Sequence, residues 1–286
     1  LFHPPMTTGT VLESRLTADG SRVVYRATES GPRELYSVPS DGSAAPVKLN
    51  APLANGVHVE GFELAAAAPL VFYRTGLEQL YAVPLDGSAP AVLIADLPTA
   101  TLQPGLVLTP DGEFVFYRAD ALTAGRIDLF ALRTDASGPP VRLNQNLVAG
   151  GDVTDFALSR DRARIVYRAD AQVDERYELF SVGPSGPPVP LIATMPSSAD
   201  VSAFALDPTS RQVVFRANLD RQIRFELYRV PIEGGPAPER ISLPLAGTSN
   251  VQADFLPLAD RVLYRADATN GVFELFAFID RRVRER

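Results

Sequence analysis

An aromatic residue followed by arginine recurs six times along this chain of 286 residues. The six pairs are Tyr25-Arg26, Tyr73-Arg74, Tyr117-Arg118, Tyr167-Arg168, Phe215-Arg216 and Tyr264-Arg265. Successive pairs are 48, 44, 50, 48 and 49 residues apart. A nearly constant period of this length predicts a repeat architecture, in which each copy folds into one supersecondary unit.

Each copy of the repeat has the pattern of four short strands. The second strand ends at the aromatic–arginine pair, and its apolar residues fall on both faces, which is typical of a strand covered on both sides. A leucine followed by an aromatic residue marks the third strand, as in Leu35-Tyr36 and Leu179-Phe180. Turn residues such as Asp41-Gly42 come next, and then a short fourth strand such as Val47–Asn50. The first strand carries a large apolar residue nine positions before the aromatic; these residues are Leu16, Leu64, Leu108, Leu158, Leu206 and Phe255.

Four short antiparallel strands in a repeat of about 40–50 residues are typical of β-propeller blades. A helical solenoid would show a period of about 3.6 residues, and no segment keeps that period over a useful length. We therefore expect an all-β fold, a six-bladed β-propeller with four antiparallel strands per blade. Residues 1–286 are expected to form one β-propeller domain, monomeric as a domain.

The sixth copy ends after its third strand, at Phe278-Ile279-Asp280. The segment Phe2–Gly9 aligns without gaps with Leu49–Gly56, which spans the end of a fourth strand and the loop after it. We therefore expect the N-terminal segment to complete the last blade beside residues 274–279. The alternative is that Arg281–Arg286 folds back as the missing strand.

The repeat resembles the blades of TolB-like propellers. The resemblance rests on Leu16–Tyr25, on Leu35–Gly42 and on Pro110-Asp111-Gly112, and it extends over all six copies. That family's Pro-Asp-Gly motif is degraded elsewhere, as at Ser159–Asp161. TolB is a periplasmic protein that binds partner proteins, and its propeller follows an α/β domain that this sequence lacks. Related propellers restrict access to serine peptidases or, in a few cases, act as lyases, so the resemblance implies a fold rather than one function.

Composition excludes several classes of function. The net charge of −7 argues against nucleic-acid binding, which needs clustered Lys and Arg, and the only basic run is Arg281–Arg286. No apolar run approaches the roughly 18 residues of a membrane span. The absence of cysteine excludes disulfides and thiolate chemistry. The chain begins at Leu1 without a methionine or a signal-peptide pattern, as expected of a mature chain or an excised fragment. The resemblance, with the acidic, proline-rich composition, favours an extracytoplasmic location, periplasmic or secreted.

Catalytic chemistry has few candidate residues. The two histidines, His3 and His58, fall at different positions of the repeat, and no G-x-S-x-G, H-E-x-x-H, P-loop or EF-hand pattern occurs. We therefore expect a non-enzymatic protein with no catalytic, cofactor-binding or metal site, and no cofactor.

The most regular polar feature is an arginine that ends the second strand and an acidic residue that begins the third. The pattern predicts ion pairs across each hairpin with a structural role, because a binding site on a propeller is usually asymmetric. The predicted pairs are Arg26–Glu34, Arg118–Asp128, Arg168–Glu178, Arg216–Glu226 and Arg265–Glu274, with Gln79 opposite Arg74.

A second recurrent polar position follows the arginine by two residues, at Asp120, Asp170, Asn218 and Asp267. Such side chains cap tight turns by accepting hydrogen bonds from backbone N–H groups. The alternative, a ring of carboxylates around Ca²⁺, needs six or more converging oxygens. The position of these residues at hairpin ends favours turn capping.

The loops between second and third strands vary most, as in Asp170–Tyr177 and Asn218–Phe225. Tyr177 and Phe225 occupy one repeat position, so we expect them to pack rather than to bind a ligand. Function tends to lie on such variable loops. The sequence therefore favours a binding or scaffold propeller that holds a protein or peptide through its loop-rich face. The alternatives are an accessory, gating domain of a larger hydrolase and a lyase or hydrolase acting at the central channel.

Overall fold

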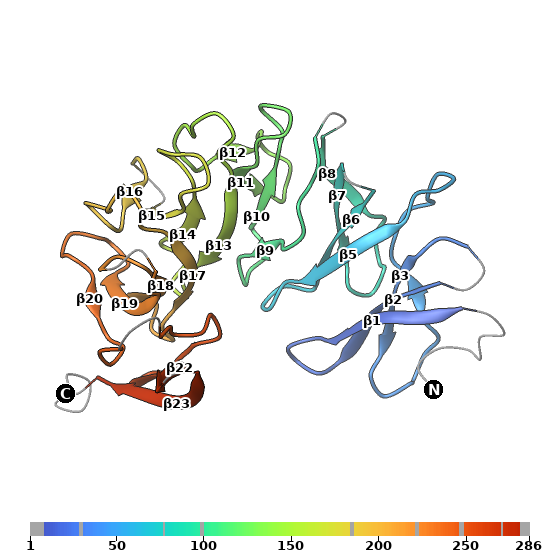
Figure 1. The fold of residues 1–286 in the computed structure, drawn as a ribbon. Coiled ribbons are helices and arrows are strands. Elements are labelled where there is room, and N and C mark those ends of the chain that lie inside the picture. The colour runs from blue at the N-terminus through green and yellow to red at the C-terminus, as the bar shows by residue number, and fades with distance from the viewer. Residues whose placement is uncertain are drawn as a thin grey trace. The chain divides into compact units, whose positions relative to one another are not determined.

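Twenty-three strands, joined by turns and loops, make up the described part of the chain in a computed structural model (Figure 1). The structure describes residues 9–28, 31–76, 78–97, 100–183, 186–220, 223–245, 249–269 and 271–280. No helix occurs within these ranges, so none of them contains a helix that could cross a membrane. The strands form six antiparallel sheets, one for each copy of the repeat.

The six sheets are called blades 1 to 6 in chain order. Blade 1 contains β1 (Thr10–Leu16), β2 (Arg22–Thr28), β3 (Glu34–Pro39) and β4 (Val47–Lys48). Blade 2 contains β5 (Val59–Leu64), β6 (Leu70–Thr75), β7 (Gln79–Pro84) and β8 (Val92–Asp96). Blade 3 contains β9 (Val107–Leu108), β10 (Phe114–Ala119), β11 (Asp128–Arg133) and β12 (Val141–Arg142). Blade 4 contains β13 (Val153–Leu158), β14 (Ile165–Ala169), β15 (Glu178–Val182) and β16 (Val189–Pro190). Blade 5 contains β17 (Val201–Leu206), β18 (Gln212–Ala217), β19 (Glu226–Pro231) and β20 (Glu239–Arg240). Blade 6 contains β21 (Leu256–Pro257), β22 (Arg261–Thr269) and β23 (Val272–Ile279).

The chain divides into two compact units, Leu1–Arg142 and Leu143–Arg286. The first unit contains blades 1 to 3, and the second contains blades 4 to 6. Within each blade the strands pair in chain order, so every connection is a simple antiparallel turn. Within the described residues, the sheet of blade 6 has three strands. Both segments considered for its fourth strand, Phe2–Thr8 and Arg281–Arg286, lie outside the described residues.

The aromatic residue of each second strand stacks on the aromatic residue of the third strand in its own blade. The stacked pairs are Tyr25–Tyr36, Tyr73–Tyr81, Tyr117–Phe130, Tyr167–Phe180, Phe215–Tyr228 and Tyr264–Phe276, with ring centroids 5.1–5.7 Å apart. The two residues of each pair are direct cross-strand neighbours, for example Tyr167 and Phe180. Such pairs stabilise a sheet and fix its register, because a slip of one residue would move one ring to the opposite face.

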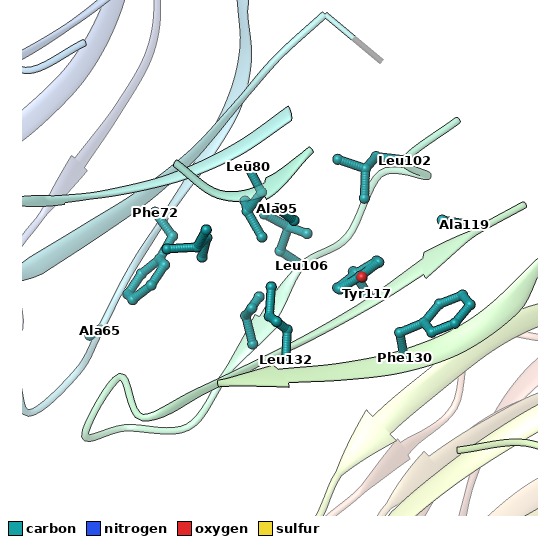
Figure 2. Packing of buried hydrophobic residues seen from close by; sticks show 12 residues of the cluster. Ala65, Phe72, Leu80, Ala95, Leu102, Leu106, Tyr117, Ala119, Phe130 and Leu132 are labelled. Carbon is teal, nitrogen blue, oxygen red and sulfur yellow. The ribbon is translucent and has the colours of Figure 1, made fainter. Parts of the chain in front are cut away.

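Within each unit, the hydrophobic core lies between successive blades. Figure 2 shows Phe72 and Leu80 of blade 2 facing Leu106, Tyr117 and Leu132 of blade 3, and all five side chains are buried. A second cluster joins blades 4 and 5, and a third joins blades 5 and 6. The middle strands of blades 2 and 5 are therefore covered on both faces, which explains their apolar residues on both sides. Burial of each large apolar side chain contributes about 1.5–3 kcal/mol to the free energy of unfolding.

Candidate functional site

Within the described residues, the register of the hairpins does not place the predicted ion-pair partners opposite each other. In every blade the cross-strand neighbour of the arginine is the leucine of the third strand, and the acidic residue, or Gln79 in blade 2, lies opposite the residue after the arginine. In blade 1, for example, Arg26 lies opposite Leu35, and Ala27 lies opposite Glu34. Successive side chains point to opposite faces of a strand, so arginine and acid lie on opposite faces of the blade. The prediction was wrong by one residue of register.

Four of the six arginines instead hydrogen-bond to the backbone of the next blade. Of the other two, Arg118 donates to Pro104 O at 3.4 Å, and Arg265 forms an ion pair with Asp254 at 2.6 Å. Arg26 Nη1 donates to the carbonyl oxygens of Val59 and Glu60 at 3.1 and 2.6 Å. Arg168 Nη1 donates to those of Val201 and Ser202 at 3.3 and 2.5 Å.

Two further arginines make the same kind of contact. Arg74 donates to Leu102 O at 3.3 Å, and Arg216 Nε donates to Val251 O at 2.6 Å. The four acceptor sites lie where the next blade begins. These four arginines therefore have the structural role that the recurrence predicts, but their partners are backbone carbonyl groups of the next blade rather than the acidic residues of the hairpin.

Two aromatic residues cover two of these arginines. The guanidinium carbon of Arg168 lies 5.0 Å from the ring centroid of Tyr177, and that of Arg216 lies 4.1 Å from the ring centroid of Phe225. Burial lowers the pKa of the Arg216 guanidinium. The expectation that Tyr177 and Phe225 pack is confirmed.

The residues two positions after the arginine accept backbone hydrogen bonds. Asp170 accepts from Asp152 N at 2.6 Å and from Glu175 N at 3.0 Å, so one carboxylate joins the entry of its blade to its own hairpin. Asp120 contacts Thr101 N and Gly125 N in the same way.

Asn218 and Asp267 accept the N–H groups of Asp200 and Asn250, which stand at the entry of the same blades. The capping of a hairpin turn is therefore confirmed for Asp120 and Asp170, whereas the bonds of Asn218 and Asp267 join the hairpin to the entry of the blade. No group of three or more His, Asp or Glu side chains that could hold a metal occurs within the described ranges.

His58 also belongs to the contacts between blades. Its Nδ1 accepts the N–H of Arg33 at 3.1 Å, while Val59 N donates to Arg33 O at 2.9 Å. Asp200 and Asn250 occupy the same place later in the chain and accept from Tyr177 N and Phe225 N at 2.9 and 2.8 Å. Sequence reasoning missed this shared position, because His, Asp and Asn have only an acceptor atom in common. His3 lies outside the described residues.

The acidic residues of the third strands find partners within their own blades. Glu34 lies 2.5 Å from Lys48 Nζ of the fourth strand, and Glu226 lies 3.5 Å from Arg240 of the fourth strand. Asp128 lies 3.2 Å from Arg126, and Glu178 lies 2.7 Å from Arg176. The contacts with Lys48 and Arg240 join the third strand to the fourth in blades 1 and 5.

Exposed aliphatic side chains mark the tips of the hairpins between second and third strands. In the second unit these are Val173, Ile223 and Val272, which are 48, 66 and 58% exposed. They come from three consecutive blades, 4, 5 and 6. Leu122 holds a comparable place in blade 3 of the first unit. The repeat did not reveal them, because the loops that carry them differ in length and sequence between the blades.

A hollow of about 350 Å³ lies at the opposite end of the strands, between blades 5 and 6. Its lining includes Arg229 and Asp280, which form an ion pair, and Phe278, whose ring centroid lies 5.0 Å from the Arg229 guanidinium. Arg261 pairs with Asp260 at 2.8 Å in the same wall. The pairing of these charges within the protein makes this hollow a weaker candidate than the hairpin tips.

No protein-family model and no curated protein sequence matches this chain. Among solved structures, one from a study of two prolyl endopeptidases and of inter-domain dynamics in their catalysis and specificity is similar, with a TM-score of 0.60 and 15% identity. The match covers 96% of this chain and 42% of that one, so this chain spans less than half of the endopeptidase. A TolB-like protein from Agrobacterium tumefaciens matches over 95% of this chain and 77% of its own, with 15% identity and a TM-score of 0.45.

The endopeptidase similarity and the six successive sheets establish the fold class as a six-bladed β-propeller. At 15% identity, the similarity extends to the fold and to nothing further.

Proposed function

We propose that this chain is a non-enzymatic binding propeller, which holds a protein or peptide through the hairpins between its second and third strands. The exposed Val173, Ile223 and Val272 carry the proposal. Three aliphatic side chains at the tips of consecutive blades expose apolar surface. A partner that buries this surface gains binding free energy.

The use of the shared polar residues within the scaffold supports the same proposal. Arg168 and Arg216 are bonded to the next blade, and Asp170 and His58 accept backbone N–H groups. Groups engaged in this way are poorly placed for proton transfer or nucleophilic attack on a substrate. The resemblance of the repeat to TolB-like propellers supports an extracytoplasmic location for this activity.

A display library of random peptides, selected on the immobilised full chain, tests the proposal. The triple variant Val173→Ser, Ile223→Ser, Val272→Ser is expected to lose at least tenfold in affinity for the selected peptides. The matched control Val92→Ser, Val141→Ser, Leu256→Ser removes three aliphatic side chains of 55–60% exposure that lie away from the hairpin tips. Equal affinity of the peptides for both triple variants would refute the proposed face.

One observation favours a second function, that of a gating domain in a larger hydrolase. The match to the prolyl endopeptidase covers nearly all of this chain but only 42% of the other. The complete open reading frame separates the two functions, because a gating domain requires a hydrolase domain in the same polypeptide.

A further inference from the structure

A hollow of about 460 Å³ lies between blades 1 and 2, at the end of the strands opposite the hairpin tips. The turn Thr17–Arg22 of blade 1 and the turn Ala65–Pro69 of blade 2 form its walls, and Leu85 and Asp86 also line it. Both blades belong to the first unit, and every lining residue lies within the described ranges. The volume is that of a ligand pocket, which is typically about 300–1,000 Å³.

Direct contact between the corresponding turns closes two other junctions of blades. Ala67 N of blade 2 donates to Pro110 O of blade 3 at 2.6 Å. Arg160 N of blade 4 donates to Ser210 Oγ of blade 5 at 2.9 Å. Among the described residues, no hydrogen bond joins the turns of blades 1 and 2. These turns therefore leave open a space that the other two junctions fill.

The sequence of blade 2 explains why this space is open. Its turn contains four consecutive alanines, Ala65–Ala68, where blade 1 has Thr17 and Asp19 among the equivalent residues. Blade 5 has Ser210, whose hydroxyl makes the contact with blade 4, at the position of Ala68. One wall of the hollow therefore consists of methyl groups, without a side-chain charge or hydroxyl.

The rest of the lining contains two carboxylates, those of Asp19 and Asp86. Asp19 accepts hydrogen bonds from Thr17 Oγ1 at 2.6 Å and from Ser21 N at 3.0 Å. Asp86 Oδ1 accepts the N–H of Ser88 at 2.9 Å. These hydrogen bonds lower the pKa of Asp19 to about 2 and also lower the pKa of Asp86. Both carboxylates are therefore charged at neutral pH.

The lining has an excess of negative charge, because Arg22 supplies one positive charge against the two carboxylates. Arg22 Nε donates to Ser37 Oγ at 2.8 Å. In the part of the chain that the structure describes, neither Asp19 nor Asp86 forms an ion pair with Arg22 or with another base. Methyl groups beside an unpaired carboxylate fit a side chain that combines an alkyl stem with a positive charge.

We infer that this hollow binds the side chain of a lysine from a partner protein. The ammonium group pairs with Asp86, and the alkyl stem packs on the alanine methyl groups of blade 2. An ammonium group needs one acceptor oxygen, whereas the planar fork of arginine takes two oxygens of one carboxylate, and Asp86 Oδ1 already accepts the N–H of Ser88. The inference does not depend on the proposed function, because the hollow and the hairpin tips lie at opposite ends of the strands.

A second copy of this chain is a poor source of the lysine. Lys48 is the one lysine of the sequence, and it pairs with Glu34 of its own blade at 2.5 Å. A second copy would have to break this ion pair before its lysine could enter the hollow. The lysine therefore comes from a different protein.

NMR titration of the full chain with N-acetyl-lysine N-methylamide tests the inference. A single side chain is expected to bind with a Kd on the order of 1 mM and to shift the amide signals of Ala66 and Ala67 in a saturable way. The corresponding norleucine derivative has the same stem without the ammonium group, and it should bind at least tenfold more weakly. Equal affinity for the two compounds would overturn the inference, because the carboxylates would then have no part in binding.

Two matched substitutions locate the contact. Asp86→Asn is expected to weaken binding at least fivefold. Asp41 stands at the same position in blade 1 and accepts the N–H of Ser43 at 2.9 Å, but it does not line the hollow, so Asp41→Asn should leave the affinity unchanged. Ala66→Leu should abolish binding, because the larger side chain fills the hollow, and the exposed position of Ala66 leaves the core intact. Absence of saturable binding, or equal weakening by the two Asp→Asn variants, would overturn the inference.

Discussion

Tyr167 of β14 stacks on Phe180 of β15, with ring centroids 5.3 Å apart and ring planes 22° apart. This pair fixes the register of the hairpin, and the register places Arg168 opposite Leu179 rather than Glu178. Arg168 therefore leaves the hairpin and bonds to Val201 and Ser202 of the next blade. The same relationship between stacked rings and arginine register holds in all six blades.

The hydroxyls of the stacked tyrosines give a first prediction. Tyr264 OH accepts the N–H of Leu243 at 3.0 Å, whereas Tyr117 OH is buried with no hydrogen-bond partner in the described structure. Tyr264→Phe should cost about 1 kcal/mol, because it leaves a backbone donor unsatisfied. Tyr117→Phe should be neutral or stabilising, and Phe215 shows that phenylalanine occupies this position in blade 5. Urea unfolding of both variants checks this, and a greater loss for Tyr117→Phe would contradict it.

Two turn glycines provide a matched pair. Gly42 and Gly87 have φ of +71° and +68° in equivalent turns of blades 1 and 2. A Cβ at Gly42 meets nothing within 4 Å, whereas one at Gly87 lies 2.6 Å from Val47 Cγ1. Each Ala substitution should cost about 1–2 kcal/mol from the left-handed backbone. Gly87→Ala should cost about 1–3 kcal/mol more from overpacking, which thermal unfolding measures. Equal losses would refute close packing of blade 2 on Val47.

Burial raises the pKa of Asp200 above its usual 3.8, although the N–H of Tyr177 opposes the shift. A raised pKa means that the folded state holds the proton more strongly than the unfolded state. The resulting stability is present below pH 3.8 and is lost as the pH rises through the folded pKa.

Asp200→Asn should therefore be more stable than the parent at pH 7 and equal to it below pH 3.8. Asn250 shows that an amide at this place still accepts the backbone N–H. Urea unfolding at the two pH values measures the difference, with Asp174→Asn in the exposed hairpin of blade 4 as the control. A stability gain that does not change between the two pH values would contradict the prediction.

The sequence predicts the fold well because the propeller repeats its core. The apolar residues on both faces of the second strand and the Leu-aromatic pair of the third were enough to place β2, β3 and their equivalents. The Arg–acid pairing was predicted wrongly because the two residues flank a loop of variable length, and loop length does not reveal cross-strand register. The stacked aromatic residues indicate the register, because an aromatic pair equivalent to Tyr25 and Tyr36 occurs in every blade.

The features that differ between blades could not be predicted from the sequence. Val173 and Ile223 resemble ordinary core residues in sequence, and only the structure shows that they stand exposed at hairpin tips. Leu275 occupies the same repeat position as five buried leucines, so the repeat itself predicts burial. Leu35, for example, is buried in a cluster with Val59 and Val71 of the next blade, and such a contact is a tertiary property.

The assignment of four of the repeated arginines to contacts between blades is tested most directly by a double-mutant cycle on Arg168 and Glu178. Arg168→Ala alone should cost about 2 kcal/mol or more, because it leaves buried carbonyl groups of the next blade without a donor. Its coupling energy with Glu178→Gln should lie below about 0.5 kcal/mol, as for independent sites. The control cycle of Arg176→Gln with Glu178→Gln should give a coupling of about 1 kcal/mol, because those side chains lie 2.7 Å apart. A coupling energy above about 1.5 kcal/mol between Arg168 and Glu178 would show that the two side chains form an ion pair across the hairpin, and it would contradict the assignment of Arg168 to the next blade.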